Sequence, residues 1–409
     1  MSYVVAFNGS RDFYQVPWAL SEAGQMASLV TDFYTPDWLA QLPGPLGKKA
    51  RARYCLGISS TQVRGDLASF FKQWQRIFGR LPKPEALRAI DERLSLRALA
   101  EAQRRQASLL LYSYYAMPAF ARPEAAALNK GLFMVHPLGP LVRQILQEDF
   151  ARFPEVKVSF EGEEETGGDG GRSGETREAC QAADFILCAS AFTQRCVEAY
   201  GVSTNRMRVV PYGYDFSALP FQPEAKQADR CRFLFVGQGI QRKGLHHLLR
   251  VWKDLAMPRS ELHLVTYRID PGIRALAADN VTIHNKLPLA ELHNLFNRCH
   301  VFVLPSLIEG FGFVLLEALG MGCYTIATEH TGLVDLAPPD DVGAVLKPGD
   351  LPRLGGALSE ARERFERGEL DAGRIRNFAE QFTWAAFRER IRSACADTPE
   401  PAPATAVSR

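Results

Sequence analysis

The chain has 409 residues, of which 46% are hydrophobic and 23% charged, and its formal net charge is +2. That length is sufficient for two domains with separate cores, and the near-neutral balance excludes a protein built to coat nucleic acid. The segment Met1–Asn8 has no basic stretch ahead of a long apolar one, and no segment approaches the roughly 20 apolar residues that span a bilayer. The eight cysteines are scattered without a CxxC pair. These features predict a cytoplasmic protein with buried, reduced thiols.

Short apolar runs alternate with helical patterns through both halves of the chain. This alternation is typical of an α/β fold with parallel sheets covered on both faces, in which ligands bind beyond the carboxyl ends of the strands. We expect strands at 3–7, 108–112, 132–136, 184–188 and 206–210, and then at 232–236, 261–266, 281–284, 301–304 and 323–327.

The region 42–105 is strongly basic, with 14 Lys and Arg against five acidic residues, a net charge of +9. We expect it to be a helical insertion. Within it, apolar and aromatic residues recur at helical spacing over 64–81, with Lys72, Arg76 and Arg80 between them. Such a helix can lie on an anionic membrane, or it can pack on the core of the first domain. We favour the core.

His136 is predicted at the carboxyl end of a strand, just before Pro137. A histidine there can donate a hydrogen bond to a sugar hydroxyl or a phosphate, although a loop histidine bonded to backbone is the alternative. The next unusual segment, 161–178, has six glycines, many acids and no apolar residue. It predicts a flexible surface loop, and a linker with no further role is the simpler interpretation.

A glycine-containing loop, Gly237–Gly244, follows the predicted strand at 232–236. A dinucleotide fingerprint would need glycine at Arg242, and a P-loop would need lysine at Leu245, so both are excluded. A phosphate-binding loop remains, with Lys243 and Arg242 as counter-charges to a diphosphate. His246 and His247 are expected on different faces of the following helix. No other ligand stands near them at metal spacing, so no metal is expected.

Two glutamates bracket the segment Glu309–Glu317 after the strand at 301–304. Gly310 and Gly312, on either side of Phe311, leave backbone N–H groups uncovered where a helix begins, which favours an anion. Glu309 can accept hydrogen bonds from sugar hydroxyls. Glu317 falls on an otherwise apolar helical stripe and needs a polar partner, such as the ribose diol of a nucleotide.

The stretch Pro305–Gly312, continued by Glu317–Gly322, resembles the acidic signature of retaining, GT-B-fold glycosyltransferases of family 4. Val209–Asp215, Phe233–Gly237 with Arg242–Gly244, and Ala183–Ser190 are similar to other segments of that family, in the same order. The resemblance is strong from about 178 to 336 and weak before about 130. One departure is Gln238, where the family usually carries arginine.

The resemblance implies an α/β GT-B fold, with two Rossmann-like domains that face each other across a cleft. The N-terminal domain, 1–210, would bind the acceptor, and the C-terminal domain, 211–378, would bind the nucleotide sugar. A helix at 379–396 would cross back to the first domain. The Pro- and Ala-rich tail, 397–409, is expected to be disordered.

The resemblance also implies transfer of a hexosyl group from a nucleotide-diphosphate sugar to a glycan, lipid-linked or small-molecule acceptor. Glu309, Lys243 and His136 would be catalytic, and the acceptor candidates are Arg11 and Asp12. The groups expected to bind the donor are Gly9, Gly237, Arg242, Gly310, Phe311, Gly312 and Glu317. No metal and no cofactor are expected, and membrane contact through 64–81 would be peripheral. The alternatives are a non-catalytic sugar-nucleotide-binding module and a GT-B sugar-nucleotide epimerase.

Overall fold

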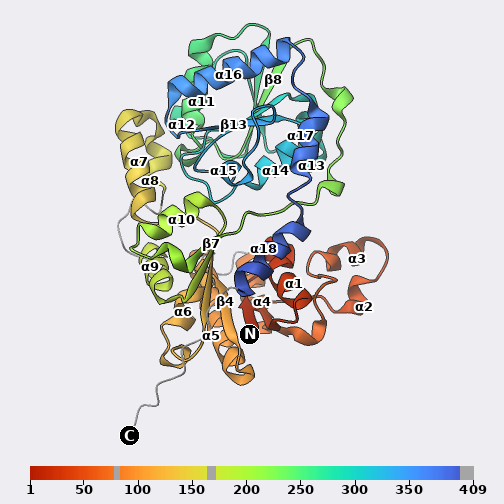
Figure 1. The fold of residues 1–409 in the computed structure, drawn as a ribbon, viewed down its shortest axis with the longest axis vertical. Helices are drawn as coiled ribbons and strands as arrows, with labels where there is room; N and C mark the ends of the chain where they lie inside the picture. Colours follow the sequence, from red (N-terminus) through yellow and green to blue (C-terminus); the bar gives the residue numbers. More distant parts are fainter. Residues whose placement is uncertain (78–82, 164–171, 397–409) are drawn as a thin grey trace.

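The computed structural model describes residues 1–77, 83–163 and 172–396. The chain forms two parallel β-sheets, each with helices packed around it, and the two halves face each other (Figure 1). The expected α/β fold class is therefore confirmed.

The first sheet has seven strands in the order β3-β2-β1-β4-β5-β6-β7, all parallel. The central strands are continuous apolar runs buried on both faces, as parallel sheets require. The bounds are β1 Tyr3–Ala6, β2 Met26–Thr31, β3 Val63–Gly65, β4 Ser108–Tyr112, β5 Lys130–Met134, β6 Phe185–Cys188 and β7 Met207–Val209.

The second sheet has six parallel strands in the order β10-β9-β8-β11-β12-β13. Its two central strands, β8 and β11, are neighbours, so the loops that follow them emerge at the same edge. The bounds are β8 Cys231–Val236, β9 Ser260–Thr266, β10 Val281–Asn285, β11 Val301–Leu304, β12 Tyr324–Thr328 and β13 Gly343–Leu346.

Helices connect the strands throughout both halves. Those of the first half are α1 Gln15–Glu22, α2 Asp37–Ala40, α3 Gly44–Arg51, α4 Leu67–Ile77, α5 Lys83–Arg105, α6 Ser113–Phe120, α7 Pro140–Arg152, α8 Lys157–Glu161, α9 Arg172–Ala182 and α10 Ala191–Glu198. Those that follow are α11 Leu245–Leu255, α12 Pro271–Arg274, α13 Leu289–Arg298, α14 Phe313–Gly320, α15 Leu333–Leu336, α16 Leu351–Glu366, α17 Ala372–Ala379 and α18 Trp384–Ala396. All eight cysteines are free and buried, as expected.

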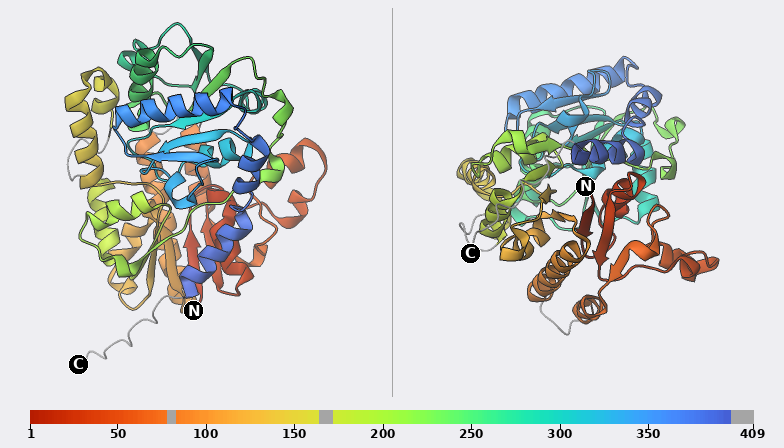
Figure 2. Two further views of the ribbon diagram at one scale, coloured as in Figure 1. Left: turned by 45° about the horizontal axis from the view of Figure 1, so that its top comes forward. Right: turned by 60° about the horizontal axis from the view of Figure 1, so that its bottom comes forward.

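The last described helix, α18, returns to the first half and packs against α1 (Figures 1 and 2). Arg388 and Arg392 of α18 both form ion pairs with Glu22 of α1. The predicted helix at 379–396 begins too early in the sequence, because α17 ends at Ala379 and α18 begins only at Trp384. Between the two helices the chain crosses the linker after β7, where Tyr214 N donates to Phe382 O over 2.9 Å.

Two predictions about irregular segments need correction. The basic region 42–105 is not only a helical insertion, since it contributes the edge strand β3 and the helix α5, which packs on β1 and β2. The segment 161–178 is not a loop throughout, because α9 begins at Arg172. The tail 397–409 lies outside the described residues. In the part of the chain that the structure describes, no helix has the length and apolar character needed to cross a membrane.

Candidate functional site

Two loops at the carboxyl ends of β8 and β11 form one unit. The carbonyl of Arg242 accepts hydrogen bonds from Leu307 N at 2.8 Å and Ile308 N at 3.0 Å. Gly244 has φ +65°, and a Cβ there would clash with the carbonyl of Pro305. A glycine is therefore required where these two main chains meet. The predicted phosphate loop and the glutamate loop are thus held side by side.

Lys243 and Glu309, one from each loop, form an ion pair. Both side chains are mostly buried, with exposed fractions of 23% and 16%. Burial alone would raise the pKa of Glu309, but Lys243 and the nearby Arg242 hold it below its ordinary value. The Glu309 carboxylate also accepts from Gly310 N at 3.1 Å, so this amide already has a partner. Glu309 is consequently a fixed anion whose orientation is set by two donors.

The glutamate loop lies directly against the first half of the molecule. A Cβ at Gly310 would be closer than 3.0 Å to the carbonyl oxygen of Val135, at the end of β5. The carbonyl of Gly310 accepts a hydrogen bond from Thr193 Oγ1 at 3.3 Å. Only glycine permits this approach, so the identity of residue 310 fixes how closely the two halves meet at the predicted site.

His136 follows β5, immediately after the residue that Gly310 contacts. The strand ends at Met134, two residues earlier than predicted. The imidazole is open to solvent on one side and lies 5.6 Å from the ring of Tyr114. The surrounding protein, followed by the positive charges of Arg11 and Arg242, lowers the pKa of His136 to about 4. At neutral pH His136 is therefore an uncharged donor and acceptor close to both predicted loops.

The helix α14 carries the second predicted glutamate, Glu317. Gly312, with φ +88°, is its N-cap residue and has no side chain to occupy the first amides of the helix. Glu317 is partly buried and accepts a hydrogen bond from Tyr214 Oη at 3.1 Å. Burial raises the pKa of Glu317, while this hydrogen bond acts in the opposite direction. The polar partner that we expected for Glu317 is thus supplied by the linker after β7. No pattern in the sequence predicts this contact.

The side chain of Phe311 is packed inside the molecule. It is 3% exposed, and its ring lies 5.6 Å from that of Tyr212 and against Gly332, where a Cβ would clash with the ring. Its carbonyl accepts from Gly332 N at 2.7 Å. Phe311 is one of the residues predicted to bind the donor, and only its main-chain N–H is available for that role.

The other predicted cation of the phosphate loop, Arg242, has a partner from the first half. Its guanidinium donates to Glu163 Oε1 at 2.8 Å, from the acidic segment after α8. Gln238 instead donates to the hydroxyl of Tyr267. Gly237 follows β8 directly and donates to Val265 O at 3.0 Å. Arg242 and Lys243 are therefore adjacent cations, each paired with a carboxylate from a different segment.

The loop after β1 has an unusual backbone. Gly9 has φ +87°, and its N–H donates to Asp32 Oδ1 at 3.0 Å. Asp12, Phe13 and Tyr14 all have positive φ, a conformation that L-residues adopt at an energetic cost. The Asp12 carboxylate accepts a hydrogen bond from Tyr212 Oη at 3.2 Å, so this first-half loop contacts the linker between the halves.

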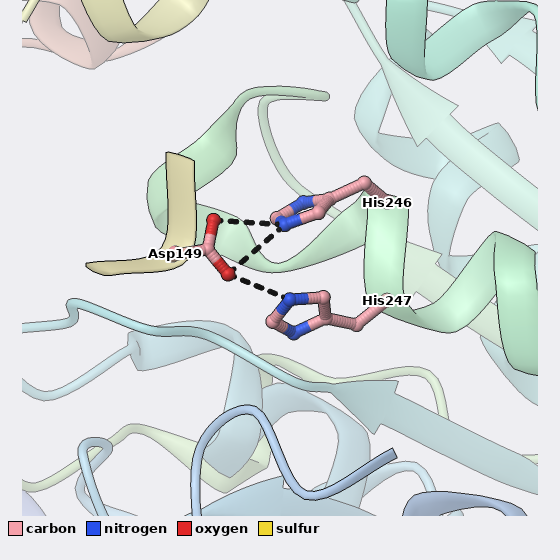
Figure 3. Close-up of side chains that lie close together, drawn as sticks. All are labelled: Asp149, His246 and His247. Atoms are coloured by element: carbon pink, nitrogen blue, oxygen red, sulfur yellow. Dashed lines mark hydrogen bonds and ion pairs between the residues drawn. The ribbon is translucent and has the colours of Figure 1, made fainter. Parts of the chain in front are cut away.

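We predicted that the two adjacent histidines would point to different faces of α11, and this prediction is wrong. Both rings reach the carboxylate of Asp149 on α7, His246 at 3.0 Å and His247 at 2.7 Å (Figure 3). All three residues are buried. The expectation that no further ligand lies at metal spacing was also wrong, because Asp149 stands almost 100 residues earlier and no local pattern connects it to the histidines.

Comparisons with known proteins show which proteins the chain resembles. The family described as "Glycosyl transferases group 1" matches residues 230–363. The MMP alpha-(1->4)-mannosyltransferase of Mycolicibacterium hassiacum is 29% identical over 222 residues, which are 51% of this chain and 52% of that protein. The D-inositol 3-phosphate glycosyltransferase of Acidothermus cellulolyticus is 27% identical over 229 residues, 50% of this chain and 51% of that protein. The alignments thus span about half the length of these curated relatives.

Solved structures match over nearly the whole chain. Sucrose-phosphate synthase of Thermosynechococcus elongatus has a TM-score of 0.62 at 17% identity, covering 97% of this chain and 98% of that one. HepE of Anabaena in complex with UDP has a TM-score of 0.59 at 14% identity, covering 97% and 100%. At these identities the likeness establishes the fold. The chain therefore has the GT-B fold, and residues 230–363 within its second half match the glycosyl transferases group 1 family.

Proposed function

We propose that this protein is a retaining glycosyltransferase that moves a hexosyl group from a nucleotide-diphosphate sugar to an acceptor. The observation that carries the proposal is the Lys243–Glu309 pair, which stands where the loops after β8 and β11 meet the first half of the molecule. Glycosyltransferase names among the relatives support the reaction class, and the neighbour HepE was solved with UDP and with UDP-glucose.

Such a reaction requires groups that stabilise the negative charge developing on the leaving diphosphate. Lys243 and Arg242 are adjacent cations, and the amides at the start of α14 add partial positive charge. In the retaining course we propose, the acceptor attacks on the face that the diphosphate leaves. The diphosphate then accepts the proton of the acceptor hydroxyl, so no protein nucleophile is required. Glu309 would hold sugar hydroxyls, and neutral His136 would hydrogen-bond the transferred group.

The nucleotide would lie on the second sheet, with Glu317 accepting hydrogen bonds from the ribose diol. Tyr214 orients that carboxylate from the linker. The loop after β1 would face the acceptor, with Arg11 and Asp12 available to it. The resemblance implies that the main chain of Gly9 approaches the donor phosphate. The N–H of Gly9 already donates to Asp32, so either this hydrogen bond would break or other main-chain atoms of Gly9 would contact the phosphate.

A lipid-linked acceptor is favoured by the surface of α4. Leu67 and Phe71 are 64% and 59% exposed, so the favoured core interpretation of 64–81 is wrong for both. Phe70, by contrast, packs on Phe33, with ring centroids 5.3 Å apart. Lys72 on α4 lines a groove together with Glu92, Arg93 and Arg97 of α5, and the two arginines form ion pairs with Asp66. Apolar side chains next to cations are the features that seat a helix on an anionic membrane.

The test begins with a panel of nucleotide sugars in thermal-shift measurements, because a ligand that binds the folded state raises the melting temperature. The best donor is then incubated with and without candidate acceptors. Transfer to an acceptor supports the proposal, whereas binding without turnover identifies a silent binding module. Conversion of the donor to an isomer without acceptor identifies an epimerase. Lys243→Ala should lower kcat by about 100- to 1,000-fold, as expected for removal of one charge-stabilising donor.

A further inference from the structure

We propose that Asp149, His246 and His247 bind one divalent transition-metal ion that links the two halves of the molecule. The three side chains come from helices on opposite sides of the interface, α7 in the first half and α11 in the second (Figure 3). Their candidate ligand atoms all lie within 4.8 Å of one another, and the side chains are 0–6% exposed. The site is separate from the Lys243–Glu309 pair and independent of the proposed transfer reaction.

The ligand atoms are close enough together to contact one metal ion. Asp149 lies 3.0 Å from His246 Nε2 through Oδ2 and 2.7 Å from His247 Nε2 through Oδ1. Two ligands bound at about 2.1 Å are about 3.0 Å apart at right angles and about 3.4 Å apart in a tetrahedron, so the imidazoles must move away from the carboxylate to hold one ion between the three groups.

Unsatisfied polar atoms in the cluster supply independent support. Among the described residues, the buried Nδ1 of His246 has no hydrogen-bond partner, whereas His247 Nε2 lies within hydrogen-bond distance of Asp149 Oδ1, at 2.7 Å. The buried Oε1 of Gln241, whose Nε2 donates to Asp149 Oδ2 at 2.8 Å, also lacks a partner in this part of the chain. Buried polar atoms without partners are rare in folded proteins, and a bound ion is one recognised cause.

The donor set identifies the class of metal. Two imidazoles and one carboxylate favour zinc and its first-row neighbours, whereas magnesium and calcium prefer oxygen ligands alone. The surroundings are those of a built site. Gln241 hydrogen-bonds both the Asp149 carboxylate and Leu146 O, which fixes the carboxylate, and the ring of Phe153 lies against both imidazoles.

The position gives the ion a structural role. Gln241 begins the turn that carries Arg242 and Lys243, so a metal held by α7 and α11 would fix this turn against the first half. Neighbouring contacts reinforce the same junction, since Gln241 N donates to Ser159 Oγ at 3.1 Å. We expect the metal to stabilise the joined arrangement of the halves and to take no part in bond making.

The experiment uses the full chain, purified with an affinity tag that contains no histidine. Metal-free protein prepared with a chelator is titrated with Co²⁺, and bound cobalt is followed by its visible d–d absorption. Zn²⁺ content is measured in parallel by mass spectrometry. About one ion per chain is expected for the wild type, with Zn²⁺ displacing Co²⁺ and Mg²⁺ failing to do so. His247→Ala and the isosteric Asp149→Asn should each lose the cobalt spectrum.

A matched control is His284→Ala, because His284 forms a second histidine pair with His263 at 3.2 Å elsewhere in the molecule. This variant should bind cobalt as the wild type does. Circular dichroism establishes that each variant is folded. The proposal is overturned if the wild type binds no stoichiometric metal, or if folded His247→Ala or Asp149→Asn protein binds as much as the wild type. Loss of binding in His284→Ala alone would place the ion elsewhere and would overturn it as well.

Discussion

Replacing Gly310 with alanine tests whether the close contact between the two halves positions the reacting groups. The added Cβ would lie closer than 3.0 Å to the carbonyl oxygen of Val135, which is main chain at the end of a buried strand and cannot rotate away. The glutamate loop must therefore retreat by roughly 0.7–1 Å to restore a normal contact. A misplacement of about 1 Å at a reacting centre can cost about 100-fold in rate. We expect Gly310→Ala to lower kcat by about 30- to 100-fold.

The assay is steady-state transfer with the donor identified by thermal shift, at saturating acceptor. The Michaelis constant for the donor should change less than kcat, because the proposed nucleotide contacts, including Glu317, lie on the second half and would move together with the donor. Gly65→Ala is the control, since a Cβ at Gly65 would meet nothing within 4 Å. Its kcat should equal that of the wild type. If folded Gly310→Ala protein keeps kcat within about threefold, the contact does not position the site and the reasoning from geometry fails.

Further predictions address the donor, the metal requirement, the histidine and the membrane. Glu317→Ala should weaken donor binding by about 10- to 150-fold in calorimetry, since a charge-assisted hydrogen bond to ribose is lost; unchanged affinity would refute the ribose assignment. Adding Mg²⁺ to the protein as purified should not raise the rate of transfer, because Lys243 and Arg242 supply the counter-charge; strong stimulation would contradict this. The pKa of His136 lies near 4, so protonation is lost well below neutrality, and His136→Gln should leave the shape of the pH–rate profile between about pH 5 and 8 unchanged. Phe71→Ser should reduce sedimentation with anionic vesicles while the melting temperature barely changes, because the ring is 59% exposed; a large loss of stability would instead favour a core position.

The strands that could be predicted are those with continuous apolar sequence. β8 and β11 are buried on both faces, and their runs of Phe, Leu and Val identify them without any knowledge of their neighbours. The strands that were missed are β2, β3 and β13. In β2 the apolar run is interrupted by Ser28, and β3 and β13 are short edge strands with exposed positions. Their pairing partners define them, and pairing is not visible in a single sequence.

In the candidate site, too, some features could be predicted from the sequence and others could not. Glu309, Glu317, Arg242 and Lys243 follow strands that were predicted correctly, so their meeting at one edge of the second sheet was accessible from the sequence. Their partners were not. Tyr214 reaches Glu317 across 103 residues, and Glu163 reaches Arg242 across 79. Contacts between residues so far apart in the sequence depend on how the two halves pack. Polar side chains at such separations form no periodic pattern from which the contacts could be predicted.

The contacts made by residues 140–163 connect the packing of the halves to the chemistry of the donor loop. This segment is α7, α8 and the residues after them, and Figure 1 shows the two helices standing beside α12 of the second half. It supplies Glu163 to Arg242 and Ser159 to the main chain of Gln241. In the function we propose, a diphosphate at this loop would compete with Glu163 for Arg242 and with Glu309 for Lys243. Since Glu163 comes from the first half, donor binding would then be coupled by charge to the packing of that half on the second.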